Sequence, residues 1–206
     1  MLEPMLAYKK RLLPIATGID INGWDKVTYT KSSGTTSRVL ADGSTVFDFA
    51  SDVTNSLRIP YQNTPSIVAD QVDITIRFNI RALPVANSRC VIVSRYRQAQ
   101  DTSSWYLSVL KSGLVNLAMN NVVYASTATV SFGVENLIRL VRIGDVFTVY
   151  LNGIQIIQAT RTGVYSSTHD WVFGSYLSSG NIILTNSPAF PADWTLLGIT
   201  VKPYTP

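Results

Sequence analysis

The carboxylates are the side chains in this sequence with the greatest capacity for acid–base chemistry, but their spacing is unfavourable. The chain has only two glutamates, Glu3 and Glu135, and they lie far apart. A retaining glycosidase needs two carboxyl groups about 5 to 5.5 Å apart, which alternate carboxylates on one strand can supply. No Asp-x-Asp or Glu-x-Asp spacing occurs in the sequence. The carboxylates therefore give no indication of an enzyme.

The single histidine and the single cysteine are equally poor candidates for catalysis. His169 is the only histidine in the sequence, so a histidine-rich metal site is ruled out. A Ser-His-Asp triad would have to use this one residue. Asp170 follows it directly, and adjacent residues on a strand point to opposite faces. Cys90 begins the apolar run 90–93, where a free cysteine ordinarily acts as a small buried hydrophobe. We expect His169 in a surface loop, Cys90 in the core and no catalytic residue.

Planar polar and aromatic side chains gather in the sequence before Trp105 and before Trp171. In loops, such side chains can hold sugar rings, whereas the two tryptophans begin apolar strands and are expected in the core. The sequence therefore predicts a glycan-binding rim, called the candidate rim below, made of Arg95, Arg97, Asp101, Tyr165, His169 and Asp170.

Metal and cofactor chemistry find little support in the sequence. Asp101, Asn120, Asn121 and Asp170 could supply oxygen ligands to calcium, but no dense carboxylate loop resembles an EF-hand. Glycine-rich loops that cradle phosphates are also absent. We expect no metal and no cofactor.

The composition predicts a folded domain without nucleic-acid or membrane partners. The 206 residues are 46% hydrophobic and 15% charged, a balance that suits a packed β-sandwich. The net charge of +4 comes from scattered arginines, which argues against nucleic acid. No apolar run approaches the roughly 20 residues that span a bilayer. The N-terminus lacks a signal-peptide pattern and one cysteine allows no internal disulfide, so we expect synthesis in a cytoplasm.

Short strands separated by turn residues run through most of the sequence. Residues 137–157 predict three strands, because Gly144-Asp145 and Asn152-Gly153 can adopt the positive φ values of two-residue hairpin turns. Residues 73–81 alternate apolar and polar side chains, which predicts a strand with one wet face. An all-β sandwich or jelly roll is therefore predicted. Further strands are expected at 45–50, 56–60, 71–81, 89–96, 105–110, 115–119, 122–125, 171–176, 182–185 and 196–201.

Residues 1–43 differ from the rest of the chain. They lack sustained alternation and contain six proline and glycine breakers. We expect an extended N-terminal arm or lead-in over residues 1–43 and the sandwich domain over residues 44–206. The arm is predicted to pack either on its own sandwich or on a neighbouring subunit.

Six segments, taken in order, resemble the laminin-G-like, concanavalin-A-like jelly-roll family. The resemblance covers residues 44–201 and implies a two-sheet antiparallel jelly-roll sandwich. The family includes carbohydrate-binding modules, glucanases and domains of bacteriophage head and tail proteins. The segments are TVFDFASDVTNSLRIP, QVDITIRFNIRAL, CVIVSRY, SSWYLSVLKSGLVNLAMN, NLIRLVRIGDVFTVYLNGIQI and WVFGSYLSS.

The resemblance, the arm and the missing chemistry together favour a role in a bacteriophage particle. We expect a non-enzymatic structural subunit of the virion, either a capsid decoration or cement protein or a head or tail appendage. If the arm of each subunit packs on the next subunit, a symmetric homo-oligomer results, and we expect a trimer. We also expect it to attach to other virion proteins. The alternative is a carbohydrate-binding module that recognises host surface glycans through the candidate rim.

Overall fold

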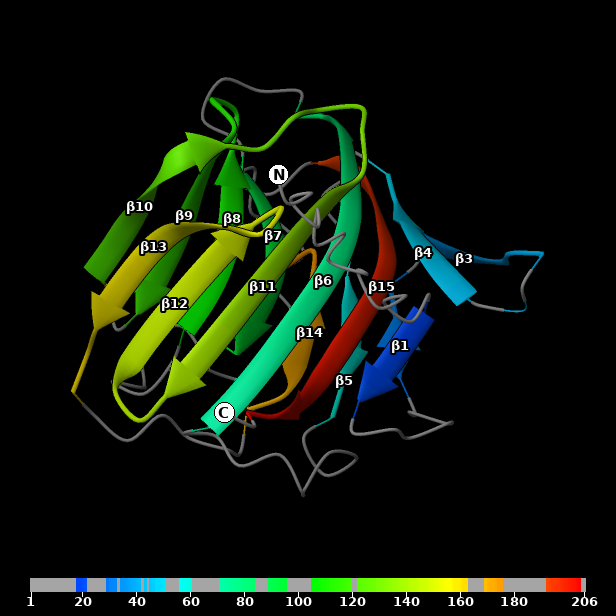
Figure 1. Ribbon diagram of the computed structural model, residues 1–206. Coiled ribbons are helices and arrows are strands. Elements are labelled where there is room, and N and C mark those ends of the chain that lie inside the picture. Colours follow the sequence, from blue (N-terminus) through cyan, green and yellow to red (C-terminus); the bar gives the residue numbers. More distant parts are fainter. Residues whose placement is uncertain are drawn as a thin grey trace, which may run out of the picture.

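The computed structural model of the chain is an all-β sandwich (Figure 1). It describes residues 18–21, 29–32, 34–41, 43, 45–50, 56–60, 71–83, 89–95, 105–119, 122–162, 169–175 and 192–204. These residues form fifteen strands in two sheets and include no helix. None of them belongs to a helix long and apolar enough to cross a bilayer. The predicted fold, a two-sheet jelly-roll sandwich, is confirmed.

The larger sheet, called sheet A, follows the order β13-β12-β11-β6-β15-β4-β3 through antiparallel pairs, and β1 adds to β15 in parallel. Its strands are β1 (Gly18–Ile21), β3 (Thr35–Val39), β4 (Thr45–Phe49), β6 (Gln71–Ala82), β11 (Asn136–Ile143), β12 (Val146–Leu151), β13 (Ile154–Thr160) and β15 (Asp193–Pro203).

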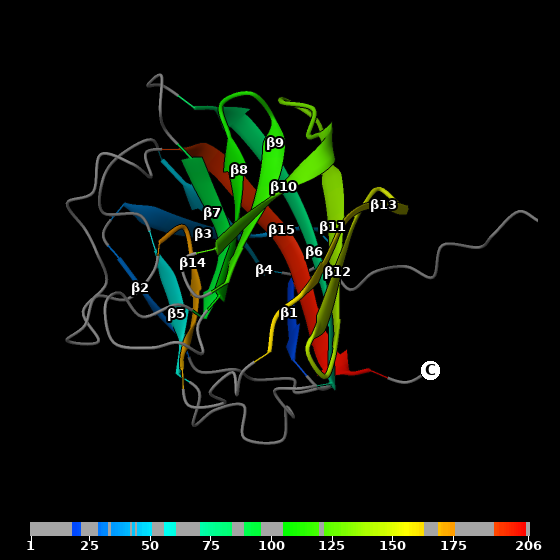
Figure 2. The same cartoon turned by 90° about the vertical axis from the view of Figure 1, so that its left-hand side faces the viewer.

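The second sheet, called sheet B, follows the order β10-β9-β8-β7-β14-β5-β2, and all its pairs are antiparallel. Figure 2 shows it facing sheet A, and in Figure 1 β10 and β13 lie side by side where the two sheets meet. Its strands are β2 (Thr30–Lys31), β5 (Leu57–Ile59), β7 (Arg89–Arg95), β8 (Trp105–Leu110), β9 (Leu114–Met119), β10 (Val122–Thr129) and β14 (Trp171–Phe173).

The core lies between the sheets because alternate residues of each strand point inward. In β6 the four large apolar residues at positions 74, 76, 78 and 80 are fully buried, as the alternation in residues 73–81 predicts. The three described tryptophans also lie in the core, where Trp105 and Trp171 meet edge to face and Trp194 stacks on Phe49 at 4.2 Å between ring centroids. Cys90 is buried as expected. These three tryptophans and Cys90 are therefore structural residues.

The predicted meander of residues 137–157 is present as β11, β12 and β13. Asn152 and Gly153 have φ values of 50° and 87°, the pair of positive angles that a type I′ turn requires. Gly144 has a φ of 56° and Asp145 stays on the negative side, which fits a type II′ turn. The turn residues thus set the register of these three strands.

The lead-in contributes strands that the sequence pattern did not reveal. Strands β1 and β3 join sheet A, and β2 joins β5 in sheet B. The described strands of the lead-in, β1, β2 and β3, therefore belong to the sandwich's own sheets. Residues 1–17 and 22–28 lie outside the described residues, and the division into an arm over 1–43 and a domain over 44–206 stays a prediction. The predicted strand at 182–185 lies outside them too.

Candidate functional site

The candidate rim is partly described, and its described members lie together. Arg95 ends β7, while His169 and Asp170 directly precede β14, which pairs with β7. The guanidinium of Arg95 donates two hydrogen bonds, of 3.1 and 2.9 Å, to the backbone carbonyl of His169. Asp170 accepts a 2.5 Å hydrogen bond from Nε of Arg58 on β5. The other three members, at positions 97, 101 and 165, lie outside the described residues.

These three described residues are buried rather than displayed to solvent. Arg95, His169 and Asp170 are 6%, 8% and 7% exposed, so the expectation of a surface-loop histidine is wrong. Burial lowers the pKa of Arg95 to about 10, with the nearby charge of Arg142 acting in the same direction and Asp170 opposing it. The guanidinium also lies 4.7 Å from the ring centroid of Trp171. In the structure these groups bind one another, and a role for them in ligand binding stays a prediction.

The outer face of sheet B presents a different set of polar residues. Register pairs place Tyr106 of β8 opposite Ser94 of β7 and opposite Ala118 of β9, and all three point away from the core. One step along the strands, Ser108 of β8 lies between Val91 of β7 and Asn116 of β9. The inward-facing residues of the same strands belong to the apolar core, which fixes the outward direction of these side chains.

Arg89 and Tyr106 bridge this outer face. Arg89 lies opposite Leu110, four register pairs away from the pair of Ser94 and Tyr106, which is two pairs along the outer face. Its Nη1 nevertheless donates a 3.0 Å hydrogen bond to the hydroxyl of Tyr106. The bond therefore passes over the intervening pair of Val91 and Ser108. Four residues on β7, β8 and β9 thus form one polar cluster on the outer side of sheet B, called the polar floor below: Arg89, Tyr106, Ser108 and Asn116.

Three polar atoms of the polar floor are buried and have no hydrogen-bond partner. They are Nε of Arg89, Oγ of Ser108 and Oδ1 of Asn116. Ser108 is 0% exposed, and it lies directly opposite Asn116 on the neighbouring strand. Most buried polar atoms in folded proteins are hydrogen-bonded, because leaving one unsatisfied costs about 1 to 3 kcal/mol. One donor and two acceptors gathered on adjacent strands are the groups that a hydroxyl-rich ligand could satisfy.

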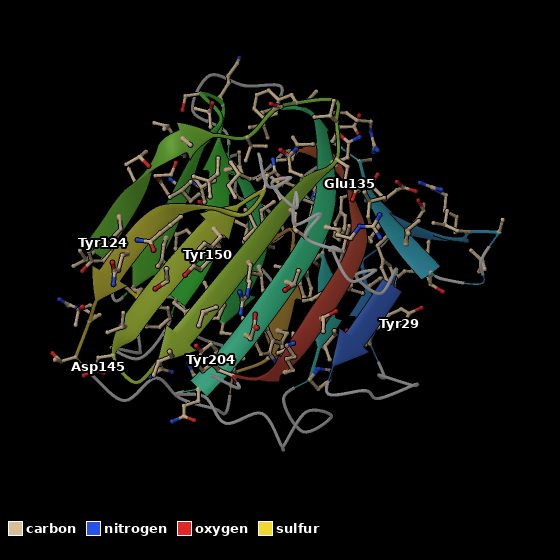
Figure 3. The ribbon with its side chains drawn as sticks, viewed as in Figure 1. Tyr29, Tyr124, Glu135, Asp145, Tyr150 and Tyr204 are labelled. Carbon is tan, nitrogen blue, oxygen red and sulfur yellow. The ribbon has the colours of Figure 1, made fainter. Side chains whose placement is uncertain are left out.

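The outer face of sheet A has the opposite character, since its charged side chains are satisfied by one another. Figure 3 looks onto this face, where Glu135 and Tyr150 are labelled. Arg139 forms a two-bond ion pair with Asp73, and Arg77 does the same with Glu135. The hydrogen bond from Arg77 holds the pKa of Glu135 below its usual value. An isolated unpartnered atom, Oδ1 of Asn79, also lies on this sheet.

The polar floor was missed by sequence reasoning, although two signals were visible. Polar residues occupy alternate positions in residues 105–110 and at position 116, inside predicted strands. The strands of sheet B also contain no aspartate or glutamate. Neither signal says which strands are neighbours. The arrangement further depends on a register shift between Val91 and Val93, which places Ser94 and Val91 on the same face.

The described residues offer no metal centre. No group of three or more histidine, cysteine, aspartate or glutamate side chains lies close enough within the described ranges to hold an ion. The polar floor also lacks paired carboxylates for acid–base catalysis. What this surface can do with its hydroxyl, amide and guanidinium groups is bind.

Comparisons with known proteins relate the chain to others by structure. No protein-family model matches the sequence, and no curated protein matches it. The carbohydrate-binding module CBM66 from Bacillus subtilis has a TM-score of 0.53 at 11% identity, over 86% of this chain and 97% of that one. The alginate lyase AlgAT5 of polysaccharide lyase family 7 has a TM-score of 0.54 at 15% identity, over 82% of each chain.

A third similar structure is the CBM40 module of the Ruminococcus gnavus IT-sialidase, bound to α2,3-sialyllactose. Its TM-score is 0.50 at 14% identity, over 66% of this chain and 78% of that one. Identities this low establish the fold alone. The chain therefore has the jelly-roll sandwich architecture of these carbohydrate-binding and carbohydrate-cleaving proteins, consistent with a concanavalin-A-like fold.

Proposed function

We propose that this chain is a non-catalytic carbohydrate-binding domain that holds a sugar against the polar floor of sheet B. The observation that carries the proposal is the set of three unpartnered buried atoms on adjacent strands β7, β8 and β9. The architecture shared with CBM66 and CBM40 supports it. This favours the alternative stated from the sequence over the virion subunit.

The chemistry of the polar floor matches a sugar because each sugar hydroxyl can both donate and accept a hydrogen bond. Oδ1 of Asn116 accepts, Nε of Arg89 donates, and Oγ of Ser108 can do either. Residues directly opposite on neighbouring antiparallel strands have Cα atoms about 4.5 to 5.5 Å apart, so the side chains of Ser108 and Asn116 lie within reach of one sugar ring. The ring of Tyr106 adds an aromatic surface beside them.

The absence of acid–base machinery on the polar floor supports binding without catalysis. Among the described residues, the carboxylates Asp48, Asp73 and Asp193 belong to sheet A. Asp170 is bonded to Arg58. A sugar held on the outer face of sheet B would thus meet hydroxyl, amide and guanidinium groups but no described pair of carboxylates.

The test is a glycan array followed by calorimetric titration of the glycans that bind. Asn116→Ala and Ser108→Ala are each expected to weaken binding about threefold to tenfold, the value of one net hydrogen bond. Gln158→Ala is the matched control, because it removes an exposed amide from the opposite sheet. Failure to bind any glycan would refute the function. Binding that neither floor variant weakens would refute the location.

The candidate rim can be tested in the same titration. Arg97→Ala and Tyr165→Ala remove two of its members that lie outside the described residues. A loss of affinity in these variants beside a loss in Asn116→Ala would place both surfaces against the ligand. Normal affinity would restrict the binding site to the polar floor.

The virion role receives no support from the similar structures described above. The expected homo-oligomer, the other virion proteins as partners and location in a virion stay predictions. Because β1, β2 and β3 lie within residues 1–43, a deletion of the whole lead-in is not a clean test of the arm. Deleting residues 1–43 removes β1, β2 and β3 and damages both sheets, so the informative deletion ends before Gly18.

A further inference from the structure

Arg89 differs from the other arginines in how its Nε atom is used. Five described arginines donate Nε to an aspartate or glutamate, and two more donate it to a backbone carbonyl. Nε of Arg89 is buried and has no partner, while Nη1 bonds to the hydroxyl of Tyr106. Of the described arginines, Arg161 shares this unpartnered Nε, but it follows β13 in sheet A.

The strands of the sheet that holds Arg89 carry no carboxylate. The strands of sheet B carry four basic residues, at positions 31, 58, 89 and 95, and no acidic residue. Asp170, just before β14, is bonded to Arg58. In sheet A, by contrast, the described outward-facing arginines are paired with carboxylates of the same sheet or its turns. Arg95 pairs in register with the core residue Trp105, and Arg58 is bonded to Asp170. Among the described residues of sheet B, Arg89 is therefore the outward-facing guanidinium that has no carboxylate partner.

The orientation of the guanidinium suits a carboxylate. The bond to Tyr106 fixes Nη1, so the edge that includes Nε is left for another acceptor. The planar fork of arginine matches the two oxygens of a carboxylate, and buried charge-assisted hydrogen bonds of this kind are about twice as strong as neutral ones. A carboxylate at this edge would lie beside Ser108, over which the bond from Arg89 to Tyr106 passes.

We propose that the glycan bound by the polar floor is a carboxylated sugar, with Arg89 binding the carboxylate and Ser108 and Asn116 binding ring hydroxyls. This inference rests on the proposed function and adds the chemical class of the ligand. Tyr106 is a positioning residue, because its hydroxyl holds the guanidinium over the site.

The test compares carboxylated polysaccharides with the same polymers after their carboxyl groups are reduced to alcohols. Polygalacturonate, alginate, hyaluronan and polysialic acid form the panel, with a sulfated dextran as a polyanion without carboxylates. Titrations are made at physiological salt, because a protein with a net charge of +4 attracts polyanions non-specifically. At least one carboxylated polymer is expected to bind, and its affinity should fall tenfold or more after reduction.

Variants of Arg89 locate the effect. Arg89→Gln is expected to lose roughly tenfold to hundredfold in affinity for the carboxylated polymer and to bind the reduced polymer as the unmodified protein does. Arg89→Lys keeps the charge but loses the fork, so it should recover only part of the affinity. Lys202→Gln removes one exposed positive charge from sheet A and is expected to bind normally. Tyr106→Phe should weaken binding while retaining preference for the carboxylated form.

The outcomes separate this inference from the function on which it rests. Binding of neutral glycans that is weakened in Asn116→Ala, together with no preference for carboxylated polymers, would overturn the inference alone. Equal binding of sulfated dextran and the carboxylated polymer would also overturn it. No binding to any polymer or to the glycan array would overturn both. If Arg89→Gln does not fold, Arg89→Lys and the reduced polymers still decide the question.

Discussion

Replacing Ser108 by alanine is predicted to stabilise the free protein while weakening its binding to a sugar. Oγ of Ser108 is buried and unpartnered. Removing it relieves an unsatisfied polar group, which costs about 1 to 3 kcal/mol. The void left by one oxygen atom, roughly 10 to 15 Å³, destabilises the variant by only about 0.3 kcal/mol. We expect a net gain of about 0.7 to 2.7 kcal/mol in the free energy of unfolding.

Ser126 provides a matched control two strands away from Ser108 in the same sheet. It is also buried, but its hydroxyl accepts a 2.9 Å bond from the backbone N–H of Val115 and donates a 2.6 Å bond to the carbonyl of Ala128. These bonds bridge the register shift between Ala125 and Thr129. Ser126→Ala leaves two backbone groups without this partner, so a loss of about 1 to 3 kcal/mol is expected.

The two serine variants should therefore shift stability in opposite directions. Urea unfolding measures both, with an unchanged m value required as evidence that the folded and unfolded states are comparable. For a protein of this size, 1 kcal/mol corresponds to about 2 to 4 °C in melting temperature. A loss of stability in Ser108→Ala as large as that in Ser126→Ala would refute the reasoning, because it would mean that the hydroxyl of Ser108 already has a partner, such as a buried water.

Three further predictions follow from groups already described. Burial raises the pKa of Cys90 well above its ordinary value, so the thiol should react with a thiol reagent only on unfolding, and urea titrations should show stability falling above about pH 8.5, where the unfolded thiol ionises and the folded one does not. Arg77 lowers the pKa of Glu135. The stabilisation of the folded state by the Arg77–Glu135 ion pair should therefore be fully present above about pH 4.3 and be lost as the pH falls through the folded-state pKa of Glu135. Arg77→Gln should remove this acid dependence in the same titration. Gly113→Ala should be more destabilising than Gly133→Ala by about 1 to 2 kcal/mol in urea unfolding, because both have positive φ but a Cβ at Gly113 would lie 2.9 Å from a backbone oxygen whereas one at Gly133 meets nothing within 4 Å; equal losses would contradict this.

The strands that could be predicted from the sequence are those in which apolar and polar residues alternate according to the face of the sheet on which they lie. In β6, residues 74, 76, 78 and 80 face the core and the residues between them face outward, so the alternation is visible in the sequence. Asn152 and Gly153 could be predicted as a turn because few residues adopt positive φ. Strands β2 and β3 could not be predicted, because an edge strand gains hydrogen bonds from its neighbour without burying an alternating face. Thr35–Val39, for example, buries only its first residue.

The polar floor could not be predicted for a related reason. Ser108 and Asn116 are unremarkable polar residues within strands, and their importance comes from being opposite each other and beneath the bond from Arg89 to Tyr106. Strand order and register are properties of the fold rather than of any one segment. The reverse holds for Arg95 and His169, whose residue types suggested a surface site but whose hydrogen bonds bury them in the interior.

The position of β15 has a consequence for how the chain folds during synthesis. The two halves of sheet A, β13-β12-β11-β6 and β4-β3, are joined only through β15. Roughly 110 residues separate the end of β6 from the start of β15, which corresponds to roughly 5 to 20 seconds of translation. During that interval one edge of β6 has no partner strand, and such edges invite aggregation. The nascent chain should therefore depend on chaperones until residue 203 leaves the ribosome, and sheet A should close as a late, long-range step.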